Sequence, residues 1–335
     1  MKKFFGRSTW EFTDVRILST AVSVGPVEGK GPLAKDFDII HQDLYLGQDT
    51  WEKAERRLFE EAIDLCINKS GLLSEQINLM VIGDLLNQLI SASFSAKYEG
   101  IPYLGVYGAC STSVESISIA ASLIEGEFAE YIIAGCSSHN ATAEKQYRYP
   151  TEYGGQKPPY AQFTVTGAGA ILIGRGSFGP KIRYSTIGKV IDMGIKDPFD
   201  MGTAMAPAAV DTIVNHLKDT SRSPKYYDLI VTGDLGAVGY QITRKMLLEQ
   251  GIDVISNYND CGLMIYSSNQ DVFSGGSGCA CSAVVTFGHI IKRLNKKEIN
   301  KVLVVATGAL LSPLSYQQGE TIPCIAHAIT IENEV

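Results

Sequence analysis

Short apolar runs alternate with amphipathic stretches along the chain, and two of these runs resemble one another about 150 residues apart. Residues 79–86 read L-M-V-I-G-D-L-L, and residues 229–236 read L-I-V-T-G-D-L-G. Each run is apolar, partly β-branched and ends at Gly-Asp-Leu, which is typical of a buried parallel strand that leads into a functional loop. The repeat predicts two related α/β halves that face each other.

A second pair of matching segments carries cysteines at corresponding places. Cys110 lies in Y-G-A-C-S-T-S, and Cys281 lies in G-S-G-C-A-C-S-A. A strand-like run, Y-I-I-A-G or V-L-V-V-A, follows each cysteine after about 25 residues. Because equivalent loops of two facing halves approach each other, the repeat places four features near one centre. These features are Asp84, Cys110, Asp234 and the Ser277–Cys281 turn.

Helical periodicity is clearest over residues 50–70, where apolar positions recur on one face. Thr50 is a fair N-cap for this helix, and Gly71 is a fair residue to end it in a left-handed conformation. Further helices are predicted over about 86–98, 114–124 and 239–250. Two more are expected, one that follows the stretch 201–210 and ends at about 216, and one that follows the turn 275–280 and ends at about 294. Strands are predicted over 15–24, 79–84, 101–107, 163–173, 228–233, 301–306 and 324–331.

Cys110 occupies the point at which the predicted strand 101–107 turns into a helix of small residues. Amide groups at the N-terminus of a helix lower the pKa of a thiol and form a binding spot for anions. An arbitrary cysteine in an apolar context is more often a buried structural residue. The small neighbours Gly108, Ala109 and Ser111 instead favour a thiol that faces a ligand.

Residues 136–160 form a long polar and aromatic segment, which we predict to be a loop. Its charged and aromatic members are Lys145, Tyr147, Arg148, Tyr149, Tyr153, Lys157 and Tyr160. Loops of this length are usually functional or disordered, and the aromatic content argues against disorder. A solvated surface excursion or a dimer contact remains an alternative. Met201 and Met205, in a later Met/Ala-rich stretch, are interpreted as core residues instead of ligand contacts.

The length of 335 residues is large for one hydrophobic core, so we expect two fused domains, 1–178 and 179–335, the first carrying the 136–160 loop. An apolar content of 45% and a charged content of 19% describe a well-buried globular protein. The net charge of −7 argues against nucleic acid, or an anionic membrane reached by bulk charge, as a partner. An anionic small ligand would therefore need a local basic cluster.

Seven cysteines, an odd number without disulfide-like spacing, indicate a reducing compartment. The C-x-C at 279–281 has no second cysteine pair or histidine at zinc-ligand spacing, so we expect no structural metal. The first ten residues lack the apolar core of a signal sequence, and no apolar run approaches the ~20 residues of a spanning helix. We expect a soluble chain whose association with a membrane, if any, is peripheral.

With both cysteine turns and both Gly-Asp loops located, the sequence resembles the thiolase-like superfamily. Its members fold as two similar βαβαβαββ halves that form a layered αβαβα core. Within it, the sequence is similar to the stage V sporulation protein AD family over nearly the whole chain. Stretches that carry the resemblance include G-D-L-L-N-Q (83–88), G-A-C-S-T-S (108–113), R-Y-P-T-E-Y-G-G-Q-K-P (148–158), G-G-S-G-C-A-C-S-A-V-V-T-F (275–287) and V-L-V-V-A-T-G-A-L-L-S-P (302–313).

This resemblance implies a component of the machinery that loads dipicolinic acid, as its calcium chelate, into the developing spore. The family is expected to bind dipicolinate without transforming it, and no cofactor is expected. The resemblance also implies the other stage V A membrane proteins as partners, a homodimer, a peripheral place at the spore inner membrane and a link to germination. The strand at 101–107 is the expected pairing edge of the dimer.

In condensing enzymes of the superfamily, the nucleophilic cysteine works with a histidine and an asparagine or second histidine from the second half. By alignment of the repeat, these positions fall on Asp234 and on or near Ser277. An ionised aspartate cannot donate to an oxyanion and serine is a weak substitute, so we predict that the chain is not an enzyme. The alternative is a Cys110-dependent acyltransferase or condensing enzyme, with His139 as the best candidate base and His327 as the second.

Dipicolinate is a flat pyridine with two carboxylates, so its site needs cationic or amide donors at two ends and an apolar or aromatic floor. Arg148 offers a bidentate fork, Lys157 a point charge, and Tyr149 or Tyr153 a stacking face. The full set of predicted ligand-binding residues is Asp84, Cys110, Ser111, His139, Asn140, Arg148, Gln156, Lys157, Asp234 and Ser277.

The two repeated aspartates have two expected consequences. If calcium enters with the ligand, Asp84 or Asp234 would complete its oxygen shell. Their negative charges should also raise the pKa of Cys110, which is the opposite of what a nucleophile requires. We therefore expect a neutral thiol in a working pocket.

Overall fold

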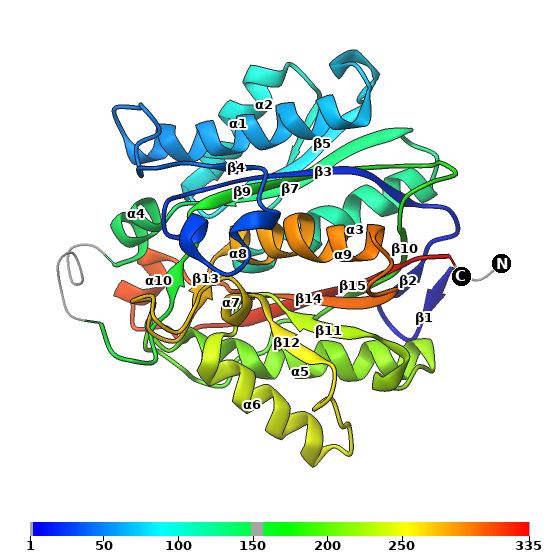
Figure 1. The fold of residues 1–335 in the computed structure, drawn as a ribbon. Helices are drawn as coiled ribbons and strands as arrows, with labels where there is room; N and C mark the ends of the chain where they lie inside the picture. The colour runs from blue at the N-terminus through cyan, green and yellow to red at the C-terminus, as the bar shows by residue number, and fades with distance from the viewer. Residues whose placement is uncertain (1–2, 149–156, 335) are drawn as a thin grey trace.

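The computed structural model describes residues 3–148 and 157–334, and their framework is a 13-stranded mixed sheet (Figure 1). The main strands of the first half are β3 (Arg16–Val24), β5 (Leu79–Asp84), β6 (Tyr103–Gly105), β7 (Tyr131–Ser138) and β9 (Gly167–Gly174). Those of the second half are β10 (Lys181–Ile187), β11 (Leu229–Thr232), β12 (Tyr258–Asp260), β14 (Lys301–Ala309) and β15 (Cys324–Glu332).

The strand order of one half repeats in the other. The first half runs β6-β5-β7-β9-β3 and the second runs β12-β11-β14-β15-β10. In both, the first three strands are parallel and the fourth is antiparallel to its neighbours. The halves meet where β3 and β10 pair antiparallel at Arg16 and Lys181. The predicted two-fold repeat is thus present, with the two Gly-Asp-Leu runs on the equivalent strands β5 and β11.

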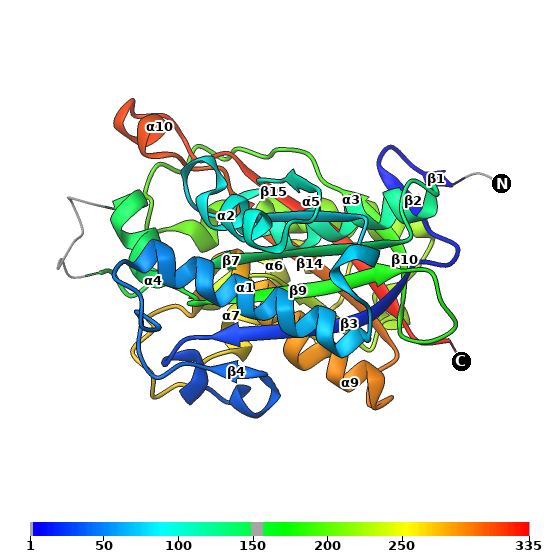
Figure 2. The ribbon, with the colours of Figure 1, turned by 90° about the horizontal axis from the view of Figure 1, so that it is seen from above.

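Helices cover both outer faces and also separate the two half-sheets (Figure 1). The outer pairs are α1 (Trp51–Ser70) with α2 (Ile90–Glu99), and α5 (Met201–Thr220) with α6 (Gly236–Glu249). The middle layer holds α3 (Thr112–Glu125) and α8 (Cys279–Val284), which continues through a π-helical stretch, 285–290, into α9 (Ile291–Asn295). Seen from above, α1 runs along β9 and β3 (Figure 2). The predicted layered α/β fold is confirmed.

The caps of α1 are those expected from the sequence. The Thr50 side chain accepts a hydrogen bond from the backbone N–H of Lys53, and Gly71 ends the helix at φ 74°. The face turned to the sheet buries apolar side chains, among them Leu58 and Phe59. Local signals therefore set both ends of this helix, and burial of its apolar face holds it on the sheet.

The helix predicted over 86–98 begins later than expected, as α2. A 3-10 turn (Asn87–Leu89) precedes it, and Gln88 and Leu89 both adopt left-handed φ values of 56° and 54°. The buried Asp84 carboxylate accepts the backbone N–H of Ala92 at 2.7 Å and so ties the first turn of α2 to the end of β5. This side-chain bond stabilises a turn where the apolar pattern alone predicts helix.

The segment 136–160, predicted as a loop, begins as regular structure. Its first residues complete β7, and α4 (Asn140–Ala143) and a π-helix (Glu144–Arg148) follow. Residues 149–156 lie outside the described part of the chain. After them, β8 (Phe163–Thr164) pairs with β13 (Gly276–Ser277), which joins the two halves beside the Cys110 turn.

Strand β6 is the outer edge of the first half-sheet. Leu104 on this strand is 47% exposed, and Phe94 and Tyr98 of the adjacent α2 are also exposed. A homodimer paired through this edge stays a prediction. Among residues 3–148 and 157–334, no helix combines the length and the apolar character that crossing a bilayer requires.

Candidate functional site

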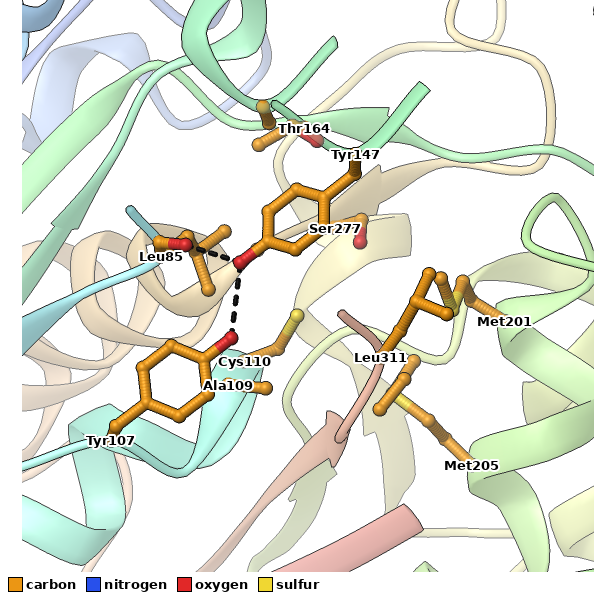
Figure 3. A pocket seen from close by; sticks show the side chains of 13 residues that line it. Leu85, Tyr107, Ala109, Cys110, Tyr147, Thr164, Met201, Met205, Ser277 and Leu311 are labelled. Atoms are coloured by element: carbon orange, nitrogen blue, oxygen red, sulfur yellow. Dashed lines mark hydrogen bonds between the residues drawn. The ribbon is translucent and has the colours of Figure 1, made fainter. Parts of the chain in front are cut away.

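A narrow cavity opens where the two halves meet (Figure 3). The cavity is small, with a volume of about 50 Å³. Both halves contribute walls, since Leu85 follows β5 and Ala309 ends β14. The described lining residues are Leu85, Tyr107, Ala109, Cys110, Ala143, Tyr147, Thr164, Met201, Met205, Ser277, Gly278, Ala309 and Leu311.

Cys110 reaches the cavity from a tight 3-10 turn (Ala109–Ser111) that leads into α3. Ala109 adopts a left-handed φ of 51°, which is unusual for a residue with a side chain and is typical of functional turns. Gly308 of β14 lies directly behind this turn. A Cβ on Gly308 would stand 2.2 Å from the Gly108 carbonyl oxygen, so only glycine permits this approach.

A buried carboxylate, that of Asp234, lies beside the Cys110 thiol. It accepts hydrogen bonds from Thr307 Oγ1 at 2.6 Å, the Gly278 backbone N–H at 3.1 Å and Ser277 Oγ at 3.4 Å. The thiol is also a hydrogen-bond partner of this carboxylate. Asp234 is only 1% exposed, and burial raises its pKa to about 6.

The electrostatic surroundings keep the Cys110 thiol protonated. Burial, and then the charge and hydrogen bond of Asp234, raise its pKa well above the usual range, although Gly278 and Ser277 act in the opposite direction. The repulsion predicted from the sequence is therefore present for Asp234. Burial and this repulsion together outweigh the lowering of thiol pKa expected at a helix N-terminus.

Comparison with known proteins places this chain in a defined family. The family model for stage V sporulation protein AD (SpoVAD) matches residues 6–332. The chain belongs to the SpoVAD family. A relative named stage V sporulation protein AD, from Bacillus subtilis (strain 168), is 51% identical over 331 residues. The match covers 98% of this chain and 98% of the relative.

Solved structures share the fold of this SpoVAD chain at low identity. A variant of OleA from Xanthomonas campestris is 14% identical with a TM-score of 0.59, over 96% of this chain and 99% of that one. Human mitochondrial 3-ketoacyl-CoA thiolase in complex with CoA is 16% identical with a TM-score of 0.60, over 96% and 98%. The 3-oxoacyl-[acyl-carrier-protein] synthase III of Aquifex aeolicus is 14% identical with a TM-score of 0.56, over 95% and 100%. These likenesses establish a thiolase-like fold.

His139, the best candidate base from the sequence, is the N-cap residue of α4 in this SpoVAD chain. Its Nδ1 accepts the backbone N–H of Ala141 at 3.1 Å, and its Nε2 lies 2.9 Å from the Leu44 carbonyl oxygen, to which it donates. Burial lowers the pKa of His139. Both ring nitrogens are thus engaged by backbone groups, and the ring is not among the described residues of the cavity wall.

Three other predicted site residues also bond to nearby backbone or side chains and lie outside the described lining. The Asp84 carboxylate accepts backbone N–H groups of the following turn and α2. Ser111 donates to the Gly108 carbonyl at 2.7 Å, and the Asn140 backbone N–H donates to a threonine hydroxyl at 3.0 Å. Of the predicted set, the cavity wall therefore brings together Cys110 and Ser277, with Asp234 behind them.

Of the two predicted cations, the structure describes the side chain of Lys157. Lys157 forms an ion pair with Glu144 and places its ammonium 5.9 Å from the centre of the Phe273 ring. Its side chain is 13% exposed. The backbone of Arg148 ends the π-helix, whereas its side chain, together with Gln156, Tyr149 and Tyr153, lies outside the described residues.

The apolar wall contains residues whose role at the site the sequence interpretation missed. Met205 belongs to the apolar core of the second half and Met201 packs against it, as interpreted, but both also line the cavity. Their spacing places them on the same face of α5, next to each other. That spacing, in a helix that starts near the junction of the halves, is the signal that would have found them.

Proposed function

We propose that this SpoVAD chain binds dipicolinate in the cavity beside Cys110, without catalysis, and helps to load it into the developing spore together with the other stage V A proteins. Membership of a sporulation family supports the setting. The state of Cys110 carries the proposal for the site. A protonated thiol that is bonded to a buried carboxylate is a poor nucleophile, but it leaves the cavity usable for binding.

The cavity suits the ring of the ligand better than its carboxylates. Met201 and Met205 form an apolar floor, and Tyr107 and Tyr147 supply aromatic walls for a flat pyridine (Figure 3). Among the described lining residues there is no lysine, arginine or histidine. The carboxylates therefore require cations from outside this lining. The candidates are Arg148 and Lys157, and Lys157 would have to exchange its ion pair with Glu144 for the ligand.

Calcium is proposed to enter as part of the dipicolinate chelate. Within the described ranges, no group of three or more histidine, cysteine or acidic side chains is arranged to hold a metal ion. Both oxygens of Asp84 accept backbone N–H groups, and both oxygens of Asp234 already accept hydrogen bonds. A calcium ion at this site would therefore take most of its oxygen ligands from dipicolinate and water.

Calorimetric titration with dipicolinate, with and without calcium, tests the proposal. Lys157→Ala and Arg148→Ala are each expected to weaken binding about tenfold or more, because each removes a charge-assisted contact to a carboxylate. Cys110→Ala should weaken binding about threefold to tenfold through lost contact, with an unchanged unfolding midpoint. Lys145→Ala, which breaks only an exposed ion pair with Glu52, is the matched control.

Two results would count against this assignment. If wild-type protein gives no binding heat with dipicolinate in either form, the proposed function fails. If binding occurs but neither Lys157→Ala nor Arg148→Ala changes the affinity, the assignment of the cations fails while the function stands.

The alternative is acyl transfer through Cys110, since the thiol opens into a cavity in a fold shared with condensing enzymes. Because the pKa of Cys110 is raised, iodoacetamide should alkylate it at neutral pH no faster than it alkylates free cysteine. The alkylation rate should keep rising as the pH is increased beyond the usual pKa of a thiol. Rapid labelling at neutral pH, or a mass shift at Cys110 after exposure to acyl-CoA, would favour the enzyme.

A further inference from the structure

A pair of tyrosines closes one side of the cavity above Cys110 (Figure 3). Tyr107 follows the edge strand β6, and Tyr147 lies on the π-helix Glu144–Arg148. Their phenolic oxygens are 3.0 Å apart, and the Tyr147 hydroxyl also contacts the carbonyl oxygen of Leu85. π-Helical turns occur frequently at functional sites, and this one carries a ring directly over the cavity.

The direction of each hydrogen bond follows from counting protons. The Leu85 carbonyl can only accept, so Tyr147 must donate its single hydroxyl proton to it. Tyr147 then has no proton left for the second contact, and Tyr107 must donate to Tyr147. Both phenolic protons are thus already donated, one to Leu85 and one to Tyr147, so the pair can only accept hydrogen bonds from the cavity. A carboxylate that reaches Cys110 finds no donor in this wall.

The contact between Tyr147 and Leu85 can be released without leaving the carbonyl unpaired. Gln146, the preceding residue, donates from Nε2 to the same Leu85 oxygen at 2.9 Å. Its Oε1 accepts the Asn87 backbone N–H at 2.9 Å. This bond holds the π-helix to the turn after β5 even when Tyr147 is released. Release of Tyr147 also frees the proton of Tyr107. An open state would therefore present a donor to an incoming carboxylate where the closed state presents only acceptors.

We infer that Tyr147 is the gate of the cavity and that Tyr107 and Tyr147 together determine which molecules reach Cys110. The small volume of the cavity, about 50 Å³, fits a closed gate. The inference rests on the proposed function for the identity of the natural ligand. In that role, the carboxylate of dipicolinate replaces Tyr147 as the acceptor of the Tyr107 proton.

Access to the gate is measurable without any ligand, by alkylation of Cys110. The other six cysteines, all in the described part of the chain, are buried, so labelling reports on Cys110. The probes are iodoacetamide, which is small, and fluorescein maleimide, which is bulky. Tyr147→Phe removes both hydrogen bonds of the gate and keeps the ring. Tyr107→Phe removes one of them, and Tyr98→Phe on α2, outside the described lining, is the control.

Tyr147→Phe is expected to raise the rate of maleimide labelling about tenfold and Tyr107→Phe about threefold, in line with the loss of two bonds or one. Iodoacetamide should gain less because it needs a smaller opening, and the pH profile of labelling should not move. Unchanged labelling in Tyr147→Phe would overturn the inference. Equal acceleration with both probes and a shifted pH profile would also overturn it, since Tyr147 would then act on the thiol acidity. Failure of the proposed function would appear only in the calorimetry.

Discussion

Replacement of Asp234 with alanine is expected to lower the free energy of unfolding by about 3–5 kcal/mol, as measured by urea denaturation. The carboxylate is 1% exposed and accepts bonds from Thr307, Ser277 and the Gly278 backbone. Removal of the acceptor leaves these donors buried without a partner. Each such group costs about 1–3 kcal/mol, partly offset because the cost of burying the charge also disappears.

Asp234→Asn is the matched control for shape. Its side-chain oxygen can keep one of the donors, so the loss of stability should be clearly smaller than for alanine. The pKa of Cys110 should fall towards its usual range in this variant, because the adjacent negative charge is gone. An Asp234→Ala protein as stable as the wild type would show that the buried acceptor is not important for folding.

Gly308→Ala is expected to abolish the proposed binding of dipicolinate and to destabilise the protein by about 3 kcal/mol or more, as seen by calorimetry and thermal unfolding. The new Cβ would lie 2.2 Å from the Gly108 carbonyl oxygen and 3.0 Å from the Ser111 nitrogen. Both are backbone atoms, so the clash cannot be relieved by rotation of a side chain. The turn that carries Cys110 must move instead.

Gly176→Ala serves as the control for this substitution. Its added Cβ would meet only a Leu18 methyl carbon at 3.4 Å, an ordinary contact, so stability and binding should stay close to those of the wild type. Wild-type affinity in Gly308→Ala would contradict the view that close contact between β14 and the Cys110 turn shapes the site.

The strands and the repeat were predictable because their signals are local. Apolar runs that end at Gly-Asp-Leu identify β5 and β11, and the caps at Thr50 and Gly71 define α1. The turn around Cys110 was predictable for the same reason, since small residues there follow a strand and precede a helix. The caps and the strand-to-helix turn at these positions are set by residues that are close in sequence.

The roles of the two repeated aspartates were not predictable, because they depend on distant partners. Asp84 bonds to the amides of its own turn. In the second half, the amide of Gly236, which corresponds to Leu86, bonds to the side chain of Asp260 at 3.0 Å, and the neighbouring Leu235 amide does so at 2.9 Å. The Asp234 carboxylate is therefore free to turn towards Cys110. No sequence pattern indicates that a residue on β12 would take over these amides.

His139 illustrates the same limit. Its position after β7 suggested a base, but the ring is fixed by Ala141 on one side and by Leu44, far away in sequence, on the other. Tyr147 was recognised as one aromatic residue among several in its segment. Only the structure identifies it as the one that contacts Leu85 and Tyr107 above the thiol.

The matched strand order of the two halves has a consequence for how such a site can originate. A duplicated fold holds two copies of every loop, and each copy begins with the same structural task. In one copy the Gly-Asp carboxylate, Asp84, performs that task by accepting the backbone N–H of Leu86. In the other copy Asp260 performs it, so Asp234 is redundant for the loop itself. Because Asp260 holds the loop, the charge of Asp234 can face the cavity without any loss of support for the backbone of the loop.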